Sequence, residues 1–476
     1  MDEQHKEPIR PVNPRRRPRS KMQVFKEAYL PVIIAGVALL LIIIFIIGSI
    51  TRAVQKKNAE DEASIAASIS QAEEDAQMAQ LAASYIAKAD LLANVYDYQG
   101  AIDLLYTFPG DFTKYPSVND KLLFYEAALD SMVLWDDLGT VLNLSFQLLI
   151  ADPAQAFSHS EYGTSFNRNF VTTEEFANIL QQLYSNDYVL VNPDNIITTE
   201  TLSDGSVVYA AKPLYLPSGK KPVMLTQTNV NYNYYLIDSD GDMVADANGC
   251  GFANKLVWDG AKFTNTLVDS SGNTLSGNFD LVPILEAFIA RHPDFSYQGA
   301  RATLALTGYN GLFGYRTHSS AKDIFGEDAY NAEVVEVKNV VAALQDAGYT
   351  LACYTYENIS YQENNVTKIQ TDLNNWNSEV TPIIGSTDIL VYAQSGDISD
   401  DAVYSGEKYE ALKSIGFRYF LGFCNDGKPW CTVTDEYVRQ GRIMVTGANM
   451  AHHADWFAGI FNAASVLDST RGDIPQ

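Results

Sequence analysis

The chain has 476 residues, 47% of them hydrophobic, and a formal net charge of −25 at pH 7. This length accommodates two or three domains and the apolar content supports a sizeable core, which excludes an intrinsically disordered protein. Residues 1–28 carry eight Lys and Arg against four Asp and Glu, a net charge of +4 that leaves −29 for the rest of the chain. An acidic body disfavours nucleic acid as a partner, because phosphate binding needs concentrated Lys and Arg.

A single membrane-spanning helix is predicted for residues 29–50. From Leu30 to Ile50 the chain is almost wholly Leu, Ile, Val and Ala, without a charged residue, and about 20 such residues span a bilayer as a helix. A cleaved secretory signal is disfavoured, because the apolar run exceeds a signal core and no small-residue cleavage site follows. The heavier basic flank, residues 1–28, is expected in the cytoplasm. We therefore expect a cell-membrane protein whose C-terminal body is extracytoplasmic.

Residues 51–140 are predicted to form a helical stalk and spacer. From residue 58 to 90 the chain contains neither Gly nor Pro, and its apolar residues recur at spacings of three and four. A seam made mostly of Ala fits either a solvated single helix or a weak coiled coil. The seam consists of Ile65, Ile69, Ala72, Ala76, Ala79, Ala83 and Ile86. Two amphipathic segments, residues 96–105 and 121–129, resemble the hairpins of tetratricopeptide-like repeats and are expected to contact a membrane protein partner.

Residues 141–476 are predicted to form an α/β domain. A capping box, Thr172 to Glu175, opens a helix that runs to Leu183. Short apolar runs then alternate with helical segments, which implies parallel strands with crossover helices, and an α/β barrel fits best. The predicted strands are residues 188–191, 223–225, 302–307, 350–353, 388–392, 419–423 and 442–446. The predicted helices between them include residues 281–291, 332–347 and 408–415.

The stretch from Lys221 to Asn229 is the central strand of this prediction. Its apolar run stops in small polar residues, and chemistry in α/β domains is usually placed just beyond the carboxyl end of a strand. The residues there are Thr228 and Asn229, neither of which ionises near neutral pH.

Four stretches resemble the polysaccharide deacetylase family, the NodB-like carbohydrate esterases of the bacterial cell envelope: residues 221–226, 292–317, 348–356 and 413–418. The resemblance implies a distorted β/α barrel of the NodB-like type, preceded here by the transmembrane helix and the helical stalk. It also implies a zinc-like divalent metal on one Asp and two His, with a second Asp as base. Such a site removes acetyl groups from amino-sugar polymers such as peptidoglycan or chitin.

The ionisable set of that family is missing. Thr228 stands where the resemblance places the base and Asn229 where it places the metal-binding Asp. Tyr354 and Asn358 stand in place of the two His, and only the hydroxyl of Thr355 is retained. An amide and a phenol cannot replace the charge of a carboxylate and the basicity of imidazoles. The degenerate positions therefore predict a barrel without catalysis and without a cofactor.

Other positions support the same interpretation. Gln147 stands where the resemblance expects a further His, and residues 392–396 have lost a Pro and an aromatic residue. His318 follows a strand-end loop and could line the cleft, whereas His292 precedes a Pro and is expected to be structural. Adjacent side chains on a helix diverge by about 100°, so His452 and His453 are expected to pack or to be solvated.

Two further sites are predicted near the same mouth. The alternating acids of residues 238–246 are typical of a calcium loop, although Met243 and Gly249 stand where an EF-hand has Gly and Glu; the alternative is an acidic surface loop. The candidate calcium ligands are Asp238, Asp240, Asp242 and Asp246. Aromatic and amide side chains suit a sugar, and residues 231–235 enrich the same mouth, unless these aromatics simply pack. The candidate substrate-binding residues are Tyr309, Asn310, Tyr315, Arg316, Thr355 and Tyr392.

Four cysteines are too few for a disulfide framework in an exported body of this size. Cys424 and Cys431 are close in sequence and could pair across a turn. The cysteine spacings do not match a zinc ribbon.

These observations predict a pseudoenzyme that binds cell-envelope glycan or scaffolds a partner. The alternative is an active metal-dependent polysaccharide N-deacetylase, a hydrolase of carbon–nitrogen bonds, with a zinc-like metal in a site rearranged around Glu357, Asp397 or Asp242. A further alternative is a structural spacer, which rests on the stalk and the helical repeats.

Overall fold

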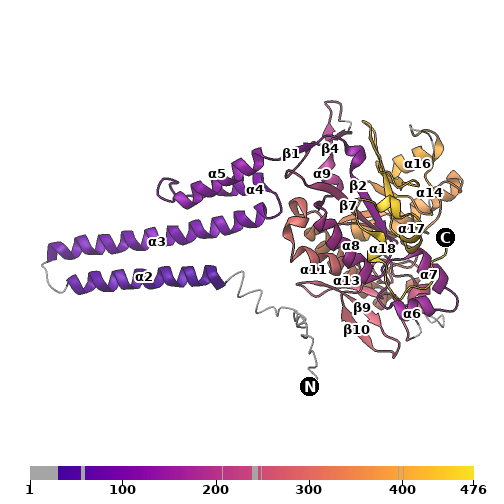
Figure 1. Ribbon diagram of the computed structural model, residues 1–476, viewed down its shortest axis with the longest axis horizontal. Helices are drawn as coiled ribbons and strands as arrows, with labels where there is room; N and C mark the ends of the chain where they lie inside the picture. The colour runs from indigo at the N-terminus through magenta and orange to yellow at the C-terminus, as the bar shows by residue number, and fades with distance from the viewer. Residues whose placement is uncertain are drawn as a thin grey trace, which may run out of the picture. The chain divides into compact units, whose positions relative to one another are not determined.

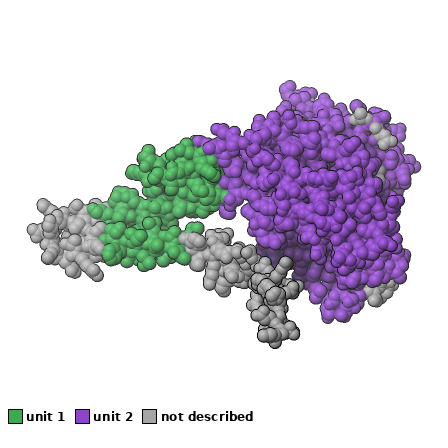
Figure 2. Space-filling model, viewed as in Figure 1, with its two compact units in different colours: residues 1–90, 100–125 green, residues 91–99, 126–476 purple. Residues whose placement is uncertain are grey.

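The computed structural model describes residues 30–54, 59–205, 207–238, 245–247, 249–394, 396–399, 401 and 403–476 (Figure 1). The chain divides into two compact units, residues 1–90 with 100–125 and residues 91–99 with 126–476 (Figure 2). The N-terminal elements are α2 (Leu30–Val54), α3 (Ala59–Ala93), α4 (Tyr98–Tyr106) and α5 (Pro116–Asp130). The helices predicted for the stalk and the two repeat-like segments are thus confirmed as helices.

Helix α2 covers the segment predicted to span the membrane. Over the part of the chain that the structure describes, no helix combines the length and the apolar character that a membrane span requires. Membrane spanning by residues 29–50 stays a prediction.

The core of the first unit differs from the predicted seam. In α3, Ala82 and Ala89 are buried while Ala83 is exposed, so the buried face lies one position away from the seam at this end. The carboxylate of Asp90 accepts hydrogen bonds from Lys121 and Tyr125, both at 2.5 Å, and joins α3 to α5. Because Ala buries little area, this polar bridge adds to a thin apolar core.

Seven parallel strands of the second unit close into a barrel, in the order β7–β11–β12–β13–β14–β16–β2 and back to β7. The strands are β2 (Leu142–Phe146), β7 (Lys221–Thr228), β11 (Thr303–Leu306), β12 (Thr350–Cys353), β13 (Ile389–Val391), β14 (Tyr419–Phe423) and β16 (Val438–Met444). The predicted α/β barrel is confirmed. The strand predicted at residues 188–191 is confirmed as β3 (Tyr188–Leu190), which pairs with β7 outside the ring; β2, which closes the ring, was not predicted.

Helices cover the barrel and a few small sheets decorate it. The helices are α6 (Pro153–Ser158), α7 (Gly163–Asn169), α8 (Thr173–Ser185), α9 (Pro193–Ile196), α10 (Tyr234–Ile237), α11 (Leu281–Ile289), α12 (Ala321–Phe325), α13 (Glu327–Ala347), α14 (Val366–Asn375), α15 (Thr381–Ile384), α16 (Glu407–Ile415), α17 (Gly447–His452) and α18 (Ala463–Val466). The further strands are β1 (Val133–Trp135), β4 (Ile197–Thr201), β5 (Val207–Ala211), β6 (Leu214–Leu216), β8 (Lys255–Trp258), β9 (Phe263–Val268), β10 (Thr274–Gly277) and β15 (Cys431–Val433).

Helix α8 begins with the predicted capping box. The backbone N–H of Thr172 donates to Glu175 Oε2 at 2.7 Å, and the Glu175 N–H donates to Thr172 Oγ1 at 3.1 Å. The carboxylate of Glu175 also forms an ion pair with Arg471 of the C-terminal segment, and both side chains are buried. A local capping signal thus anchors the end of the chain.

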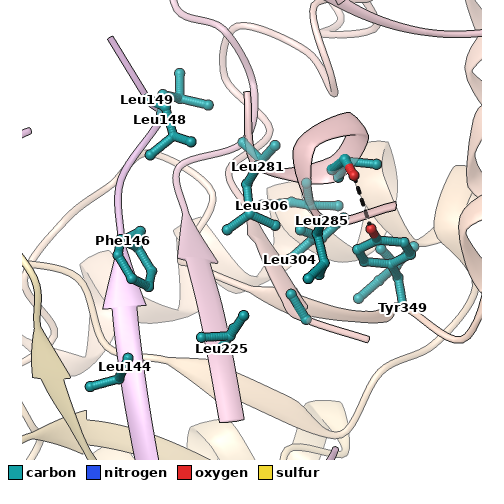
Figure 3. Close-up of a cluster of buried hydrophobic side chains, with 14 of the residues drawn as sticks. Leu144, Phe146, Leu148, Leu149, Leu225, Leu281, Leu285, Leu304, Leu306 and Tyr349 are labelled. Carbon is teal, nitrogen blue, oxygen red and sulfur yellow. Dashed lines mark hydrogen bonds between the residues drawn. The ribbon is translucent and has the colours of Figure 1, made fainter. Parts of the chain in front are cut away.

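The outer wall of the barrel is an apolar layer between strands and helices. Leu225, Leu304 and Leu306 project outward from β7 and β11 toward α11, where Leu281 and Leu285 lie (Figure 3). All five are essentially fully buried. Successive strand residues point to opposite faces, so the residues between them line the barrel interior.

The barrel interior changes from apolar to polar toward the carboxyl ends of the strands. Met224 and Ala305 pack inside with Val391 and Leu421. At the upper end the inward residues are polar and buried. They include Ser145, Thr226, Thr228 and Arg442.

Cys424 and Cys431 do not pair. Both are free thiols in the structure. Cys424 follows β14 and Cys431 begins β15. These two strands pair with opposite edges of β16. Leu421 of β14 pairs with Gln440 on one edge, and Cys431 of β15 pairs with the same residue on the other. Strand β16 therefore lies between the two thiols, and the structure shows no disulfide between Cys424 and Cys431.

Candidate functional site

The barrel mouth is formed by the segments that follow the strands. Asn229, Thr355 and Gln394 come one, two and three residues after the ends of β7, β12 and β13, and their φ angles are 61°, 60° and 52°. Asn358 also has a positive φ, 54°. Such left-handed residues cost of order 1–3 kcal/mol when they are not glycine, although Asn tolerates them better than most. The surrounding packing therefore holds these loops in one specific backbone shape.

A neutral hydrogen-bond network fills the ends of β7 and β11. Thr228 Oγ1 donates to the Phe146 carbonyl at 3.2 Å. Thr307 Oγ1 donates to Asn229 Oδ1 at 3.2 Å and accepts from Asn231 Nδ2 at 2.5 Å. These polar side chains are buried. The network supplies donors and acceptors but no group that titrates near neutral pH.

A guanidinium lies inside the barrel below this network. Arg442 donates to Ser145 Oγ at 3.0 Å and to the Tyr392 carbonyl at 2.5 Å, and its Cζ lies 4.2 Å from the Phe423 ring. Its side chain is fully buried, and burial lowers its pKa to about 10; Tyr354, which also hydrogen-bonds it, opposes that shift. Within the described residues no carboxylate pairs with it. The sequence placed residue 442 in a strand but gave no sign of this role.

A buried carboxylate orients the loop after β12. Asp372 of α14 accepts from the backbone N–H of Tyr356 and Glu357, at 2.7 and 2.8 Å, and from the Tyr361 hydroxyl at 2.7 Å. Burial raises the pKa of this carboxyl, while those three hydrogen bonds oppose the shift. Asp372 therefore fixes the segment that carries Thr355. Because Asp372 lies 16 residues after Tyr356, the sequence pattern around Thr355 did not indicate this role.

Tyrosines form the rim above the network. Tyr235 is 41% exposed and packs against Tyr162 at a ring distance of 5.9 Å. Burial of its hydroxyl raises the pKa of Tyr235, and the neighbouring hydroxyls of Tyr309 and Tyr354 raise it further. The rim thus combines aromatic faces with phenol hydroxyls that stay protonated at neutral pH.

The predicted substrate-binding residues divide into two groups. Tyr309 is half-buried at the rim, and the neighbouring Asn310 accepts from the Tyr234 N–H at 3.4 Å. Tyr315 and Tyr392 are buried in the apolar core around the barrel, and their predicted role in substrate binding stays a prediction. Thr355 is fully buried and accepts from the Ile359 N–H at 2.9 Å, which makes it a loop cap.

Of the four degenerate positions, three are buried. Thr228, Asn229 and Tyr354 are less than a tenth exposed, and Asn358 is half-buried, with its carbonyl accepting from Gln394 at 2.6 Å. The structure brings them together at the mouth, on strands β7 and β12 that both neighbour β11.

The carboxylates of the rearranged-site hypothesis are already paired. Glu357 forms an ion pair with Lys368. Asp397 accepts from Arg439 at 2.9 Å and from the Tyr404 hydroxyl at 2.5 Å. Asp242 lies outside the described residues.

The predicted calcium ligands are only partly described. Asp238 and Asp246 belong to the described residues, whereas Asp240 and Asp242 do not. No cluster of three or more His, Cys, Asp or Glu that could hold a metal ion occurs in the part of the chain with assigned positions. The calcium site stays a prediction, as does the expected absence of a cofactor.

The remaining predicted positions have structural contacts. His292 packs against Tyr184 at 4.4 Å, as its predicted structural role requires. The predicted divergence of the His pair is confirmed: His452 contacts the Ile474 carbonyl at 2.8 Å, while His453 stacks on Trp456 at 4.4 Å. Gln147 donates to the Asn169 carbonyl at 3.2 Å.

Comparison with known proteins gives few matches. No family model and no curated protein matches the chain. Among solved structures the chain is similar to one described as "Streptococcus pyogenes deacetylase PplD in complex with acetate", with 12% sequence identity and a TM-score of 0.32. That alignment covers 67% of this chain and 95% of the other.

Proposed function

We propose that the chain is a membrane-anchored extracytoplasmic protein whose deacetylase-like barrel has no catalytic activity and binds a cell-envelope glycan at its mouth. The observation that supports this function best is the neutral network of Thr228, Asn229, Thr307 and Asn231, which occupies the strand ends where a hydrolase needs ionisable groups. The proposal includes no resident metal and no acid–base residue.

The chemistry of the mouth suits a sugar. Hydroxyls and amides exchange hydrogen bonds with sugar hydroxyls, and aromatic faces such as that of Tyr235 pack on the apolar face of a sugar ring. The partly exposed rim, Tyr235 and Tyr309, would make first contact. An amino-sugar polymer such as peptidoglycan or chitin is the class of ligand that we propose.

Binding of the purified full-length chain to insoluble peptidoglycan and to chitooligosaccharides tests this function. We expect saturable binding to at least one of them, weakened by Tyr235→Ala because the exposed ring is lost. Tyr215→Ala is the matched control: this Tyr on β6 is similarly exposed, at 47% against 41%, but lies outside the mouth. Equal binding by the two variants, or no binding to either glycan, would contradict the proposal.

Metal analysis tests the loss of catalysis separately. After equilibration with zinc and removal of free metal, we expect less than stoichiometric zinc in the full-length protein, and no release of acetate from acetylated chitooligosaccharides. Stoichiometric zinc together with acetate release that Glu357→Ala abolishes would establish the enzyme alternative instead.

A scaffold role is the second candidate, and it rests on a different part of the chain. Leu123 and Phe124 of α5 are 56% and 61% exposed on adjacent positions of a short helical unit. Exposed large apolar side chains that lie together are typical of a protein-binding surface. Failure of glycan binding, with stable co-purification of a membrane protein that Phe124→Ala disrupts, would favour this role.

A further inference from the structure

One cavity of the second unit has a volume of about 490 Å³. Segments from separate parts of this unit line it: Lys255 at the start of β8, Arg316 in the loop after β11, Phe325 of α12, and Tyr330 and Glu333 of α13. Its volume lies in the range of small-molecule sites. Arg316 was predicted from the sequence as a substrate-binding residue, but the proposed glycan site does not use it.

The guanidinium of Arg316 is held rigidly at this cavity. Its Nη1 donates to the carbonyls of Tyr232 and Asn310, at 3.0 and 2.9 Å, and its Cζ lies 4.0 Å from the centre of the Tyr234 ring. Among the described residues neither Nε nor Nη2 has a hydrogen-bond acceptor. These two nitrogens form one edge of the guanidinium, which is the geometry that binds a carboxylate through two parallel hydrogen bonds.

The acidic groups near Arg316 leave that edge available. Glu333 directs its carboxylate to Lys255 Nζ, at 2.9 and 3.2 Å, and to the backbone N–H of Arg316 at 3.0 Å. Asp238 acts on Arg316 electrostatically. Burial lowers the pKa of Arg316, and the nearby Tyr234, Glu333 and Asp238 oppose that shift. A desolvated guanidinium edge that no described residue accepts from is stabilised when an anion binds.

Two neighbouring polar atoms also lack a partner. His318 Nε2 and the Tyr234 hydroxyl are buried without a hydrogen bond to any described residue. Their rings pack edge to face at 6.3 Å, and Arg316 is close enough to His318 to lower its pKa, after burial. Unsatisfied buried polar atoms are rare in folded proteins, and both of these belong to residues that contact or interact electrostatically with Arg316.

The opposite wall of the cavity is apolar. Phe325 is 39% exposed, Tyr330 is half-buried, and Ala329 and Ala332 present small exposed side chains on α13. We infer that this cavity binds a small carboxylic acid with a ring-shaped or apolar body, its carboxylate on the Nε–Nη2 edge of Arg316. Either a uronic acid or a short peptide with a free C-terminal carboxylate would present this chemistry.

Calorimetry on the full-length protein tests the inference with two matched pairs of probes. Glucuronic acid is compared with glucose, and N-acetylphenylalanine with its C-terminal amide. We expect at least one acid to bind about tenfold more tightly than its neutral partner, because hydrogen bonds to charged groups contribute about 1.5–3 kcal/mol. The pair that shows the preference identifies the source of the carboxylate. Equal affinity within both pairs would overturn the inference.

Two variants locate the binding. Arg316→Lys keeps the charge but loses the two-nitrogen edge, and we expect at least a tenfold loss of affinity for the acid. Ala332→Trp fills the cavity while every contact of Arg316 is kept, and we expect binding to disappear, with Ala332→Ser as the control of unchanged affinity. Thermal unfolding checks that each variant folds. Acid binding that survives Ala332→Trp would also overturn the inference, whereas glycan binding at the mouth is independent of both variants.

Discussion

On the outer wall of the barrel, alternate residues such as Leu225 and Leu304 are apolar, fully buried and packed against helices (Figure 3). At the mouth, the same strands β7 and β11 end in Thr228, Asn229 and Thr307, which are equally buried but entirely polar. The wall depends on side-chain volume and the mouth depends on matched hydrogen bonds. A barrel can therefore keep its fold while the chemistry at its strand ends is replaced, provided that the new polar groups satisfy one another.

The two regions also differ in how they accommodate a buried positive charge. In the wall, Arg471 is held by Glu175, with guanidinium–carboxylate distances of 2.6 and 2.7 Å. In the interior, Arg442 is satisfied by carbonyls, a hydroxyl and an aromatic face instead. One region pairs its charge and the other surrounds a single charge with dipoles.

Arg471→Met is expected to have the largest effect, a loss of about 3–5 kcal/mol in the free energy of unfolding, because it leaves the carboxylate of Glu175 buried without its cation. Arg442→Met should cost less, because no opposite charge is orphaned. Guanidinium chloride denaturation of the full-length protein measures both. The double variant Glu175→Gln/Arg471→Met is the control and should recover part of the loss. A larger loss for Arg442→Met would contradict the distinction between paired and dipole-solvated charge.

Leu304→Ala tests the packing of the wall and is expected to cost about 3 kcal/mol, since a fully buried Leu leaves both a transfer and a cavity penalty. Thr228→Ala at the mouth removes one hydroxyl–carbonyl hydrogen bond and should cost about 1 kcal/mol. Urea unfolding midpoints of the two variants give the comparison. Similar losses would mean that side-chain volume, not hydrogen bonding, determines the stability of the mouth as it does that of the wall.

The sequence alone predicted most of the secondary structure of the wall. Alternating apolar runs predicted six of the seven barrel strands within a few residues, and the capping box predicted the start of α8. Strand β2 escaped because its five residues, Leu142–Phe146, include buried Asn143 and Ser145, which a hydropathy pattern assigns to a loop. The sequence predicted β3 as a strand but could not place it outside the ring, since an apolar run indicates a buried strand without indicating which strands it pairs with.

The mouth could be predicted only as a set of positions. The resemblance identified Thr228, Asn229, Tyr354 and Asn358, which lie at the carboxyl ends of β7 and β12, the two neighbours of β11. It gave no sign of Thr307, Asp372 and Arg442, which come from elements that are distant in sequence. Composition also did not indicate that Tyr315 and Tyr392 are buried.

Thr307→Val is expected to disrupt the mouth without disturbing the wall. The change keeps the volume nearly constant but removes the hydroxyl that joins Asn229 to Asn231, so two buried amide groups lose a partner. We expect a loss of about 1–2 kcal/mol in stability and faster amide exchange in residues 229–231. Thr303→Val, on the same strand but outside the network, is the matched control. Equal exchange rates in the two variants would show that Thr307 does not organise the loop.

The smallest expected effect is a pH dependence that comes from His318, which interacts electrostatically with Arg316. Burial, and next the charge of Arg316, lower the pKa of His318 below its ordinary value of about 6.5. The folded state therefore binds fewer protons than the unfolded state as the pH falls below that value, so stability is complete above it and decreases on acidification toward the folded-state pKa. His318→Gln should flatten the pH dependence of the unfolding free energy over this interval. Thermal unfolding of this variant and of the unaltered protein at a series of pH values measures the difference. If the variant keeps the slope of the unaltered protein, the pH dependence does not come from His318, and the polar groups around Arg316 are better solvated than their burial indicates.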